Sequence, residues 1–327
     1  MHHQHNASIP LERELLSYSG SYSGVVSKPY STKESMLLRF ALDVAPLWNS
    51  PDEFTKALDL LPSSVRPSVT RFHFPADRKL ALGSQLLQRF VIAKVYSNGK
   101  PSDEMPTLAS ISIIRDAKSG RPSYHVPSPH EGQEWVLQDY NVSHHNPKSA
   151  SSDPCLVVLV ARVTAAASAS SLLRIGVDIV PTAHSRGTSS PASFLESFRD
   201  AGVFTAREIK NIFSPLNEED KVKLLFLHWA MKEAYCKAVG TGLVTNLLAI
   251  DFRDIKLDVV EKGTRDTQVK VFVDDVAEVG WMLEIGKLLD GHYVAIAADS
   301  CSIENGEEMD GAWVWISIEE DILKHWS

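Results

Sequence analysis

FLHWAMKEAYCKAVGTGL, residues 226–243, is the most informative stretch of the sequence. It overlaps the longest predicted helix, Asn217–Val239, which Asn217 can cap and Gly240 ends. Four of its side chains are spaced i, i+3, i+7 and i+11 and share one helix face: Phe226, Trp229, Glu233 and Lys237. A surface ion pair explains the acid and the base. It explains the neighbouring tryptophan less well, so a structural face and a functional face both remain open.

The strand predicted just before this helical region carries an isolated acid. Leu172–Val180 is a predicted strand, and its apolar run RIGVDIV contains only Asp178 as an acidic residue. A carboxylate is costly inside a core, so Asp178 should face solvent, a partner or a cation. An aspartate that caps a turn at the strand end is the alternative.

Two polar motifs precede that strand. KSGRP, Lys118–Pro122, is predicted to be a turn whose two cations flank Gly120 and can bind phosphate. YNVSHH, Tyr140–His145, is predicted to be a turn after the strand Trp135–Val142, where a hydroxyl and an imidazole could meet an anion. Each motif alone is equally typical of an ordinary polar loop.

Periodicity and capping signals predict the other elements. An apolar stripe predicts a helix over Asp77–Tyr96, and Thr205 with Glu208 has the spacing of a capping box. The remaining expectations are strands at Leu156–Thr164, Thr107–Arg115 and Ala249–Val259, and a terminal segment, Trp313–His325, that docks through its Trp and Ile residues.

Length and charge limit the classes of function. The chain has 327 residues, which indicates roughly two domains. A net charge of −8 argues against generic nucleic-acid binding, which uses a basic surface. The charge is uneven, because residues 1–174 carry 18 Lys and Arg against 15 Asp and Glu, whereas residues 175–327 carry 15 against 26. Chance variation and a division of function between the halves both explain this asymmetry.

Compartment signals are those of a cytoplasmic protein. The three cysteines are widely spaced and form no CxxC pair, so we expect neither a disulfide framework nor a zinc site. The first residues lack the apolar core of a signal peptide. The longest clean apolar run, Cys155–Ala161, is far too short to cross a bilayer, so no membrane association is expected.

Taken in order, GRP, NVSHH, GVDIV and WAMKEAYCKAVGTGL resemble the motifs of the large, single-chain 4'-phosphopantetheinyl transferases of the surfactin-synthetase-activating type. Fungal and eukaryotic members are the most similar. The last motif, approximately WxxKE[AS][FY]xKxxGxGL in that family, is long and specific. The resemblance covers about residues 65–300, so it leaves the first 60 and the last 27 residues unexplained.

The resemblance implies an α/β (α+β) fold with two similar subdomains related by pseudo-twofold symmetry, and with coenzyme A and Mg²⁺ between them. We expect residues 1–174 to form the nucleotide side of the coenzyme A site. Residues 175–327 should supply the metal-binding and catalytic helix and a C-terminal extension. The implied reaction moves 4'-phosphopantetheine from coenzyme A to a serine of an apo carrier domain and releases 3',5'-ADP.

The resemblance also implies roles for individual residues. Asp178 and Glu233 would bind Mg²⁺, and Glu233 would act as base, directly or through a water. Lys237, and with it Lys232, would neutralise charge on the pyrophosphate, while Trp229 would pack beneath the cofactor contact. The implied nucleotide contacts are Arg115, Lys118, Arg121, Asn141, Ser143 and His144.

The chain also departs from the family pattern. Many bacterial members have a second acid at the position of Val180, so two protein ligands would remain for the metal. Arg66 and Arg71 are candidates for a cation that precedes the family's first helix.

The implied partners are carrier domains of fatty-acid, polyketide and nonribosomal-peptide synthases or of aminoadipate reductase, and the protein should be a monomer. A non-catalytic relative that binds coenzyme A or a carrier is the alternative, against which the intact Asp178 and Glu233 argue. A Mg²⁺-dependent nucleotide hydrolase is disfavoured because no GxxxxGK[ST] loop is present.

Overall fold

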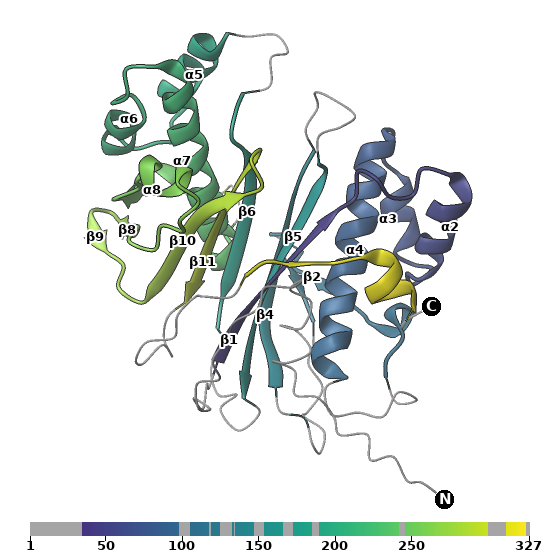
Figure 1. Ribbon diagram of the computed structural model, residues 1–327. Coiled ribbons are helices and arrows are strands. Elements are labelled where there is room, and N and C mark those ends of the chain that lie inside the picture. The colour runs from purple at the N-terminus through teal and green to yellow at the C-terminus, as the bar shows by residue number, and fades with distance from the viewer. Residues whose placement is uncertain are drawn as a thin grey trace, which may run out of the picture.

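The computed structural model describes residues 35–97, 105–117, 119–124, 133, 135–146, 154–165, 173–184, 190–241, 246–299 and 312–324. These residues form two halves, each with a long helix packed across antiparallel strands (Figure 1). The predicted α/β architecture of two similar subdomains is confirmed. Residues 1–34 and the end of the helix signature, Gly242 and Leu243, lie outside the described residues.

The first half is built around helix α4 (Pro75–Tyr96), 22 residues long, which contacts strands β4 and β5. Its sheet has the strand order β12-β1-β5-β4. The predicted helix at Asp77–Tyr96 and strand at Leu156–Thr164 are confirmed. The elements are β1 (Ser35–Asp43), α2 (Pro51–Asp59), α3 (Arg66–Thr70), η2 (Leu108–Ser110), β2 (Ile114–Arg115), β3 (Pro122–Ser123), β4 (Trp135–His145), β5 (Leu156–Ala165) and β12 (Val314–Trp315).

The second half repeats this plan with helix α7 (Glu218–Val239), also 22 residues long, packed on a sheet of order β10-β11-β6. As predicted, Asn217 caps α7, and Gly240 ends it with φ 77°. The capping box of Thr205 and Glu208 is also present. The elements are β6 (Ile175–Pro181), α5 (Pro191–Arg199), α6 (Ala206–Ile212), η5 (Leu247–Ala249), β7 (Ile250–Arg253), α8 (Leu257–Glu261), β8 (Lys270–Val273), β9 (Val276–Ala277), β10 (Trp281–Leu288) and β11 (His292–Asp299).

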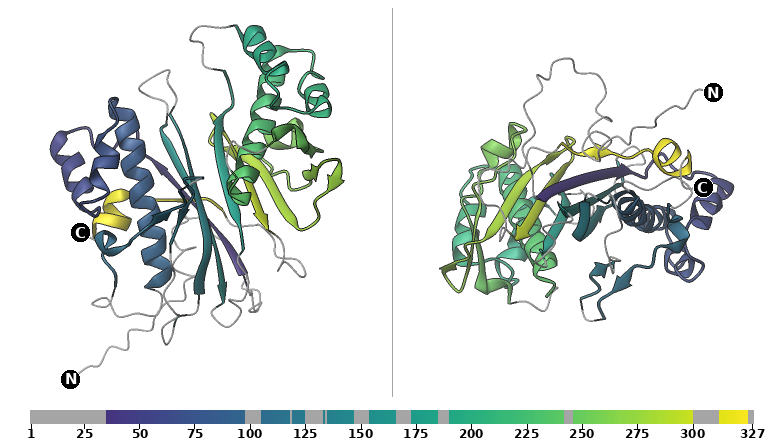
Figure 2. Two further views of the ribbon diagram at one scale, coloured as in Figure 1. Left: turned by 180° about the vertical axis from the view of Figure 1, so that it is seen from behind. Right: turned by 90° about the horizontal axis from the view of Figure 1, so that it is seen from below.

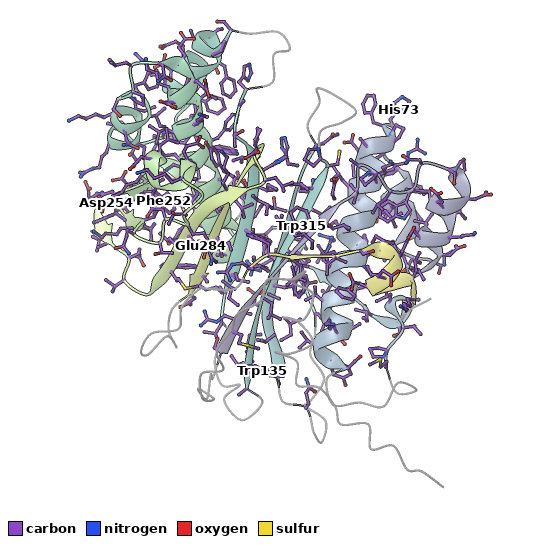
Figure 3. The ribbon with its side chains drawn as sticks, viewed as in Figure 1. His73, Trp135, Phe252, Asp254, Glu284 and Trp315 are labelled. Carbon is purple, nitrogen blue, oxygen red and sulfur yellow. The ribbon has the colours of Figure 1, made fainter. Side chains whose placement is uncertain are left out.

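The two sheets face each other in the middle of the molecule, with α4 and α7 on their outer sides (Figures 1 and 2). A separate apolar cluster fills this interface, with Val158 and Val160 of β5 against Val177 of β6 and Ile296 of β11. Apolar side chains on opposite faces of each sheet therefore belong to different cores. A buried ion pair of 2.9 Å between Arg39 of β1 and Glu284 of β10 also links the halves. Glu284 is labelled in Figure 3.

Three predicted elements are wrong. Thr107–Arg115 contains the 3₁₀ turn Leu108–Ser110, where the Ser110 amide and hydroxyl both donate to the Thr107 carbonyl, and only Ile114–Arg115 is a strand. Ala249–Val259 is a four-residue strand followed by helix α8, because Asp254 has a φ of 67° that ends the strand. The predicted turn Tyr140–His145 is part of β4, which pairs with β5 as far as His145 opposite Leu156.

The C-terminal segment packs on the first half. Strand β12 pairs with β1 in parallel, and the one-turn π-helix η6 (Ile318–Leu323) follows it. Ile316, Ile318 and Ile322 are buried in the core beneath α4, so this segment docks through isoleucines as predicted. Trp315 is 41% exposed, so it contributes less to this docking than expected. Residues 312–324 thus lie with the first half, although they were predicted as an extension of the second.

Candidate active site

The centre of the candidate site is an ion pair between β6 and α7. Asp178 is 7% exposed, and its Oδ1 lies 2.6 Å from the Nζ of Lys237. The Lys237 ammonium also donates to the Val177 carbonyl at 3.1 Å and to the Ser143 Oγ at 3.0 Å. Ser143 in turn donates to Asp178 Oδ1 at 2.8 Å. The structure therefore brings together three residues that were predicted separately, one from the first half and two from the second.

Glu233 lies one turn before Lys237 on the same face of α7. Burial raises the pKa of Glu233, and the Asp178 carboxylate raises it further, whereas Lys237 lowers it. Two carboxylates thus interact with one ammonium between them. Repulsion between like charges makes such a pair a suitable receptor for a further cation.

The aromatic part of the predicted helix face packs on α5. Trp229 meets Phe198 edge to face at 6.3 Å, and Phe226 lies 5.7 Å from Phe194. Both α7 side chains are half-buried. Trp229 therefore joins α5 to α7 one helical turn before Glu233, and its expected place beneath the cofactor contact stays a prediction.

Three side chains of β4 at alternate positions interact with β6. Ser143 binds Asp178, the Asn141 Oδ1 accepts from the Val177 amide at 3.1 Å, and the Asp139 carboxylate accepts from the Ile175 amide at 2.8 Å. Successive strand residues point to opposite faces, which explains why these residues share one face. The structure places Asn141 and Ser143 between the two sheets, and their expected contacts with the nucleotide stay predictions.

Arg121 follows Gly120, whose φ of 70° makes the tight turn of the GRP motif. Its guanidinium donates to the carbonyls of Lys237, Ala238 and Ile175 and to the Asp139 carboxylate. Four of the five N–H donors of Arg121 therefore have protein partners, and its expected contact with the nucleotide stays a prediction.

The other predicted cations of the basic loop differ from Arg121. Arg115 is exposed and donates to the Gly120 carbonyl at 3.2 Å, so its charge remains accessible to an anion. Lys118 lies outside the described residues. Arg66 is bound to Asp59 at 2.6 Å on the surface, away from this loop. Arg71 is exposed and lies over the Phe72 ring.

His144 is exposed on the face of β4 opposite to Ser143. Desolvation by the surrounding protein lowers its pKa, and the Lys237 ammonium lowers it further. Two residues further on, Asn146 donates to Asp77 of α4 at 3.0 Å, which joins the end of β4 to the start of that helix. Figure 3 labels His73, just before α4, and Trp135, at the start of β4. These two residues lie at opposite ends of the first half. His144 thus stands near the N-terminus of α4.

Lys232 is not part of the site, contrary to the prediction. It is 1% exposed and forms an ion pair of 2.9 Å with Glu208, which is fully buried. It also donates to the carbonyls of Leu247 and Ile250. Adjacent residues on a helix point in different directions, so Lys232 cannot share the face of Glu233. Lys232 instead ties α7 to α6 and β7.

Two residues of the site were missed by sequence reasoning. Asp139 lies in no predicted motif, although its separation of two from Asn141 and four from Ser143 was a usable signal. Gly176 sits where a Cβ would lie 2.0 Å from the Ala234 carbonyl oxygen, so it permits β6 and α7 to approach closely. Its place before Asp178 in GVD was the available clue.

Two other kinds of feature concern metal binding and membrane insertion. Among the described residues, no group of three or more His, Cys, Asp or Glu side chains is arranged to hold a metal ion. The helices of the described part of the chain include none with the length and apolar character of a membrane span.

Comparison with known proteins gives matches over both halves. Residues 174–297 match the family model "4'-phosphopantetheinyl transferase superfamily", and residues 47–150 match "4'-phosphopantetheinyl transferase, N-terminal". The L-aminoadipate-semialdehyde dehydrogenase-phosphopantetheinyl transferase of Schizosaccharomyces pombe is 30% identical over 267 residues, which cover 79% of this chain and 91% of that protein.

Two further relatives are more distant. The protein of the same name from Homo sapiens is 26% identical over 80% of this chain and 74% of its own length. The 4'-phosphopantetheinyl transferase A of Aspergillus fumigatus is 29% identical over 61% of this chain and 62% of its own length.

Proposed function

The chain belongs to the 4'-phosphopantetheinyl transferase superfamily, and from this membership we propose the reaction in detail: it transfers the 4'-phosphopantetheine arm of coenzyme A to the serine hydroxyl of an apo carrier domain, with release of 3',5'-ADP. The observation that carries the proposal is the meeting of Ser143, Asp178 and Lys237 beside Glu233, at the boundary between the halves. Both halves belong to one chain, so we infer that a monomer contains the whole site.

The transfer is a displacement at phosphorus. The serine Oγ forms a bond to the phosphorus that bears pantetheine, and the bond from this phosphorus to the bridging oxygen of the pyrophosphate breaks. The bridging oxygen leaves on 3',5'-ADP, and the serine loses its proton. In such reactions the protein acts mainly by positioning the reactants and stabilising charge.

We assign the proton to Glu233. Its raised pKa makes it a stronger base than an ordinary glutamate, while its place on the half-buried face of α7 leaves it accessible. Lys237 would release Asp178 and neutralise charge on the leaving pyrophosphate. Within the described part of the basic loop, Arg115 is exposed and could reach the nucleotide phosphates. His144 is also exposed, and it lies near the start of α4 because Asn146 binds Asp77.

The carboxylates of Asp178 and Glu233 fit a Mg²⁺ ion by the chemistry of their donor set. Hard oxygen ligands suit this ion, and pyrophosphate oxygens and water would complete its shell. When bound, Mg²⁺ supplies positive charge that offsets the carboxylates and the pyrophosphate. The apolar Val180 leaves these two carboxylates as the proposed protein ligands.

The names of the relatives guide the choice of acceptor. Several are named for L-aminoadipate-semialdehyde dehydrogenase, so we propose the carrier domain of aminoadipate reductase as one acceptor. Carrier domains of fatty-acid, polyketide and nonribosomal-peptide synthases are further proposed acceptors. The cytoplasm is the proposed location, since three widely spaced cysteines with no CxxC pair fit a reducing compartment.

Mass spectrometry of the carrier tests the function. The protein is incubated with Mg²⁺, coenzyme A and each apo carrier domain, and a mass gain of one phosphopantetheine is expected. Glu233→Gln should abolish the gain, whereas Glu218→Gln, at the exposed start of the same helix, should keep it. Binding of coenzyme A without a mass gain on any carrier would instead support a non-catalytic relative. Full activity of Glu233→Gln would refute the assigned base.

A further inference from the structure

Arg121 lies where three elements of the candidate site meet. Its Nη1 donates to the carbonyls of Lys237 and Ala238 at the C-terminus of α7, and its Nη2 donates to the carbonyl of Ile175 at 2.9 Å. The carbonyls at a helix C-terminus lack partners within the helix, and a cation there is favourable for the helix dipole. Arg121 therefore holds the end of α7 against the beginning of β6.

Asp139 completes this arrangement from the first half. It follows a break in the pairing of β4 with β5, between Leu137 and Asp139. One of its carboxylate oxygens receives both an N–H of Arg121 and the amide of Ile175. The two side chains are 17% and 14% exposed, so the pair is largely shielded from water. Because two donors converge on this oxygen and one of them is a guanidinium, the contact fixes the direction of the Asp139 side chain as well as its distance.

The pair is the first contact in a ladder between the sheets. On one edge β6 pairs with β11, whereas toward β4 its amides at Ile175 and Val177 are satisfied by Asp139 and Asn141. The next contact of the ladder is Ser143 with Asp178. Side chains thus replace backbone pairing between β4 and β6, and they set the separation of the two halves at the site.

We propose that Arg121 and Asp139 are positioning residues for Lys237 and Asp178. Arg121 binds the backbone carbonyl of Lys237, and Asp139 binds Arg121 and the amide of Ile175, three residues before Asp178. The pair therefore holds the backbones that carry Lys237 and Asp178. Neither residue needs to touch coenzyme A. The inference rests on the proposed function, because it assigns the purpose of the arrangement to phosphopantetheine transfer.

Conservative variants separate this role from nucleotide binding. Arg121→Lys keeps the charge but cannot reach four acceptors, and Asp139→Asn keeps the shape but loses the charge. Either variant should lower kcat by about tenfold or more, because displacement by about 1 Å can cost a hundredfold. The KM for coenzyme A should stay within about twofold of the wild-type value, because neither residue needs to touch coenzyme A. Assays run at 25 °C, below the Tm measured for each variant.

Two variants serve as controls. Arg115→Lys alters the accessible cation of the same loop and should raise the KM for coenzyme A. Arg199→Lys changes a surface ion pair with Glu196 and should leave kcat and KM at wild-type values.

Three results bear on the proposal in different ways. A raised KM with unchanged kcat in Arg121→Lys would make Arg121 a nucleotide ligand and overturn it. A lowered Tm with unchanged kcat in both variants would reduce the pair to a purely structural role. If one variant does not fold, the kinetic constants of the other still test the proposal. Absence of transfer by the wild-type protein on every carrier would refute the proposed function itself, whatever the variants do.

Discussion

Replacing Gly176 with alanine tests whether the close contact of β6 and α7 sets the active geometry. Gly176 lies two residues before Asp178 in β6, and Ala234 lies three residues before Lys237 in α7. An added Cβ would lie 2.0 Å from the Ala234 carbonyl oxygen and 2.5 Å from the Ala238 amide nitrogen. Both obstacles are backbone atoms, so no side-chain rotation can relieve the clash.

The geometry gives the size of the expected effect. Ordinary contact begins near 3.4 Å, so α7 and β6 must separate by more than 1 Å at this point. Overpacking of this kind costs about 1–3 kcal/mol of folding free energy. The same movement pulls the Lys237 ammonium away from Asp178, and a displacement of about 1 Å can lower kcat by about a hundredfold. We therefore expect Gly176→Ala to lose several degrees in Tm and most of its turnover.

The assay combines calorimetric unfolding with the carrier mass measurement under saturating coenzyme A. Gly286→Ala is the matched control, since Gly286 lies in β10 of the same sheet and its Cβ would meet the flexible Arg265 side chain at 3.0 Å. That control should retain wild-type Tm and kcat within small margins. Wild-type Tm and kcat in Gly176→Ala would show that the helix and strand tolerate the methyl group, and the reasoning from close approach would fail.

Three further predictions concern buried groups. Lys232→Met should destabilise the fold by about 3–5 kcal/mol, because it leaves the buried Glu208 carboxylate without its cation; denaturant unfolding measures this, and the added change Glu208→Gln should recover part of the loss. Burial alone would raise the pKa of Glu208, but His228 and Lys232 hold it below its ordinary value of 4.5, so its contribution to stability is present above pH 4.5 and is lost as the pH falls through the lowered pKa. Unfolding measured against pH should show this loss in the wild type and a smaller one in Glu208→Gln; equal slopes would contradict the assignment. Ile322→Ala should cost about 2–5 kcal/mol, since Ile322 is fully buried under α4, whereas the exposed Glu319→Ala should change little.

Where local signals were strong, the sequence predicted the elements that carry the candidate site residues. Asn217 and Gly240 determine the ends of α7, and the spacing of Glu233 and Lys237 places them on one face. Asp178 was identified because a lone acid in an apolar strand requires a partner, and the structure shows that partner to be Lys237. Long-range contacts between these elements followed from the motif resemblance rather than from periodicity.

Failures arose where the partner of a polar residue is distant in sequence. Asn141 and Ser143 resemble loop residues, yet their partners on β6 are 36 and 35 positions away and turn the segment into a buried strand. Lys232 stands next to Glu233 in sequence, but its partner Glu208 lies on α6 behind the helix. Arg121 lies in a turn of the kind that can bind phosphate, but its N–H groups donate to the carbonyls of Ala238 and Ile175. The sequence alone does not show that these distant carbonyls lie beside it.

The charges that remain accessible support the proposal of a metal-dependent reaction. Arg121 and Lys232 are committed to protein partners, which leaves Lys237 and Arg115 as the predicted cations that can reach a pyrophosphate within the described residues. Lys237 already balances Asp178, and Glu233 adds a second negative charge beside it. A polyanionic pyrophosphate at this place would meet more negative than positive charge, with a repulsion of several kcal/mol at the effective dielectric constant of a protein site.

Binding of coenzyme A should therefore depend on an added divalent cation, and it should depend on it less in Glu233→Gln, where one of the carboxylate charges is removed. Titration calorimetry with coenzyme A, with and without Mg²⁺, measures this coupling. Equal dependence on Mg²⁺ in both proteins would place the cation elsewhere than at Asp178 and Glu233.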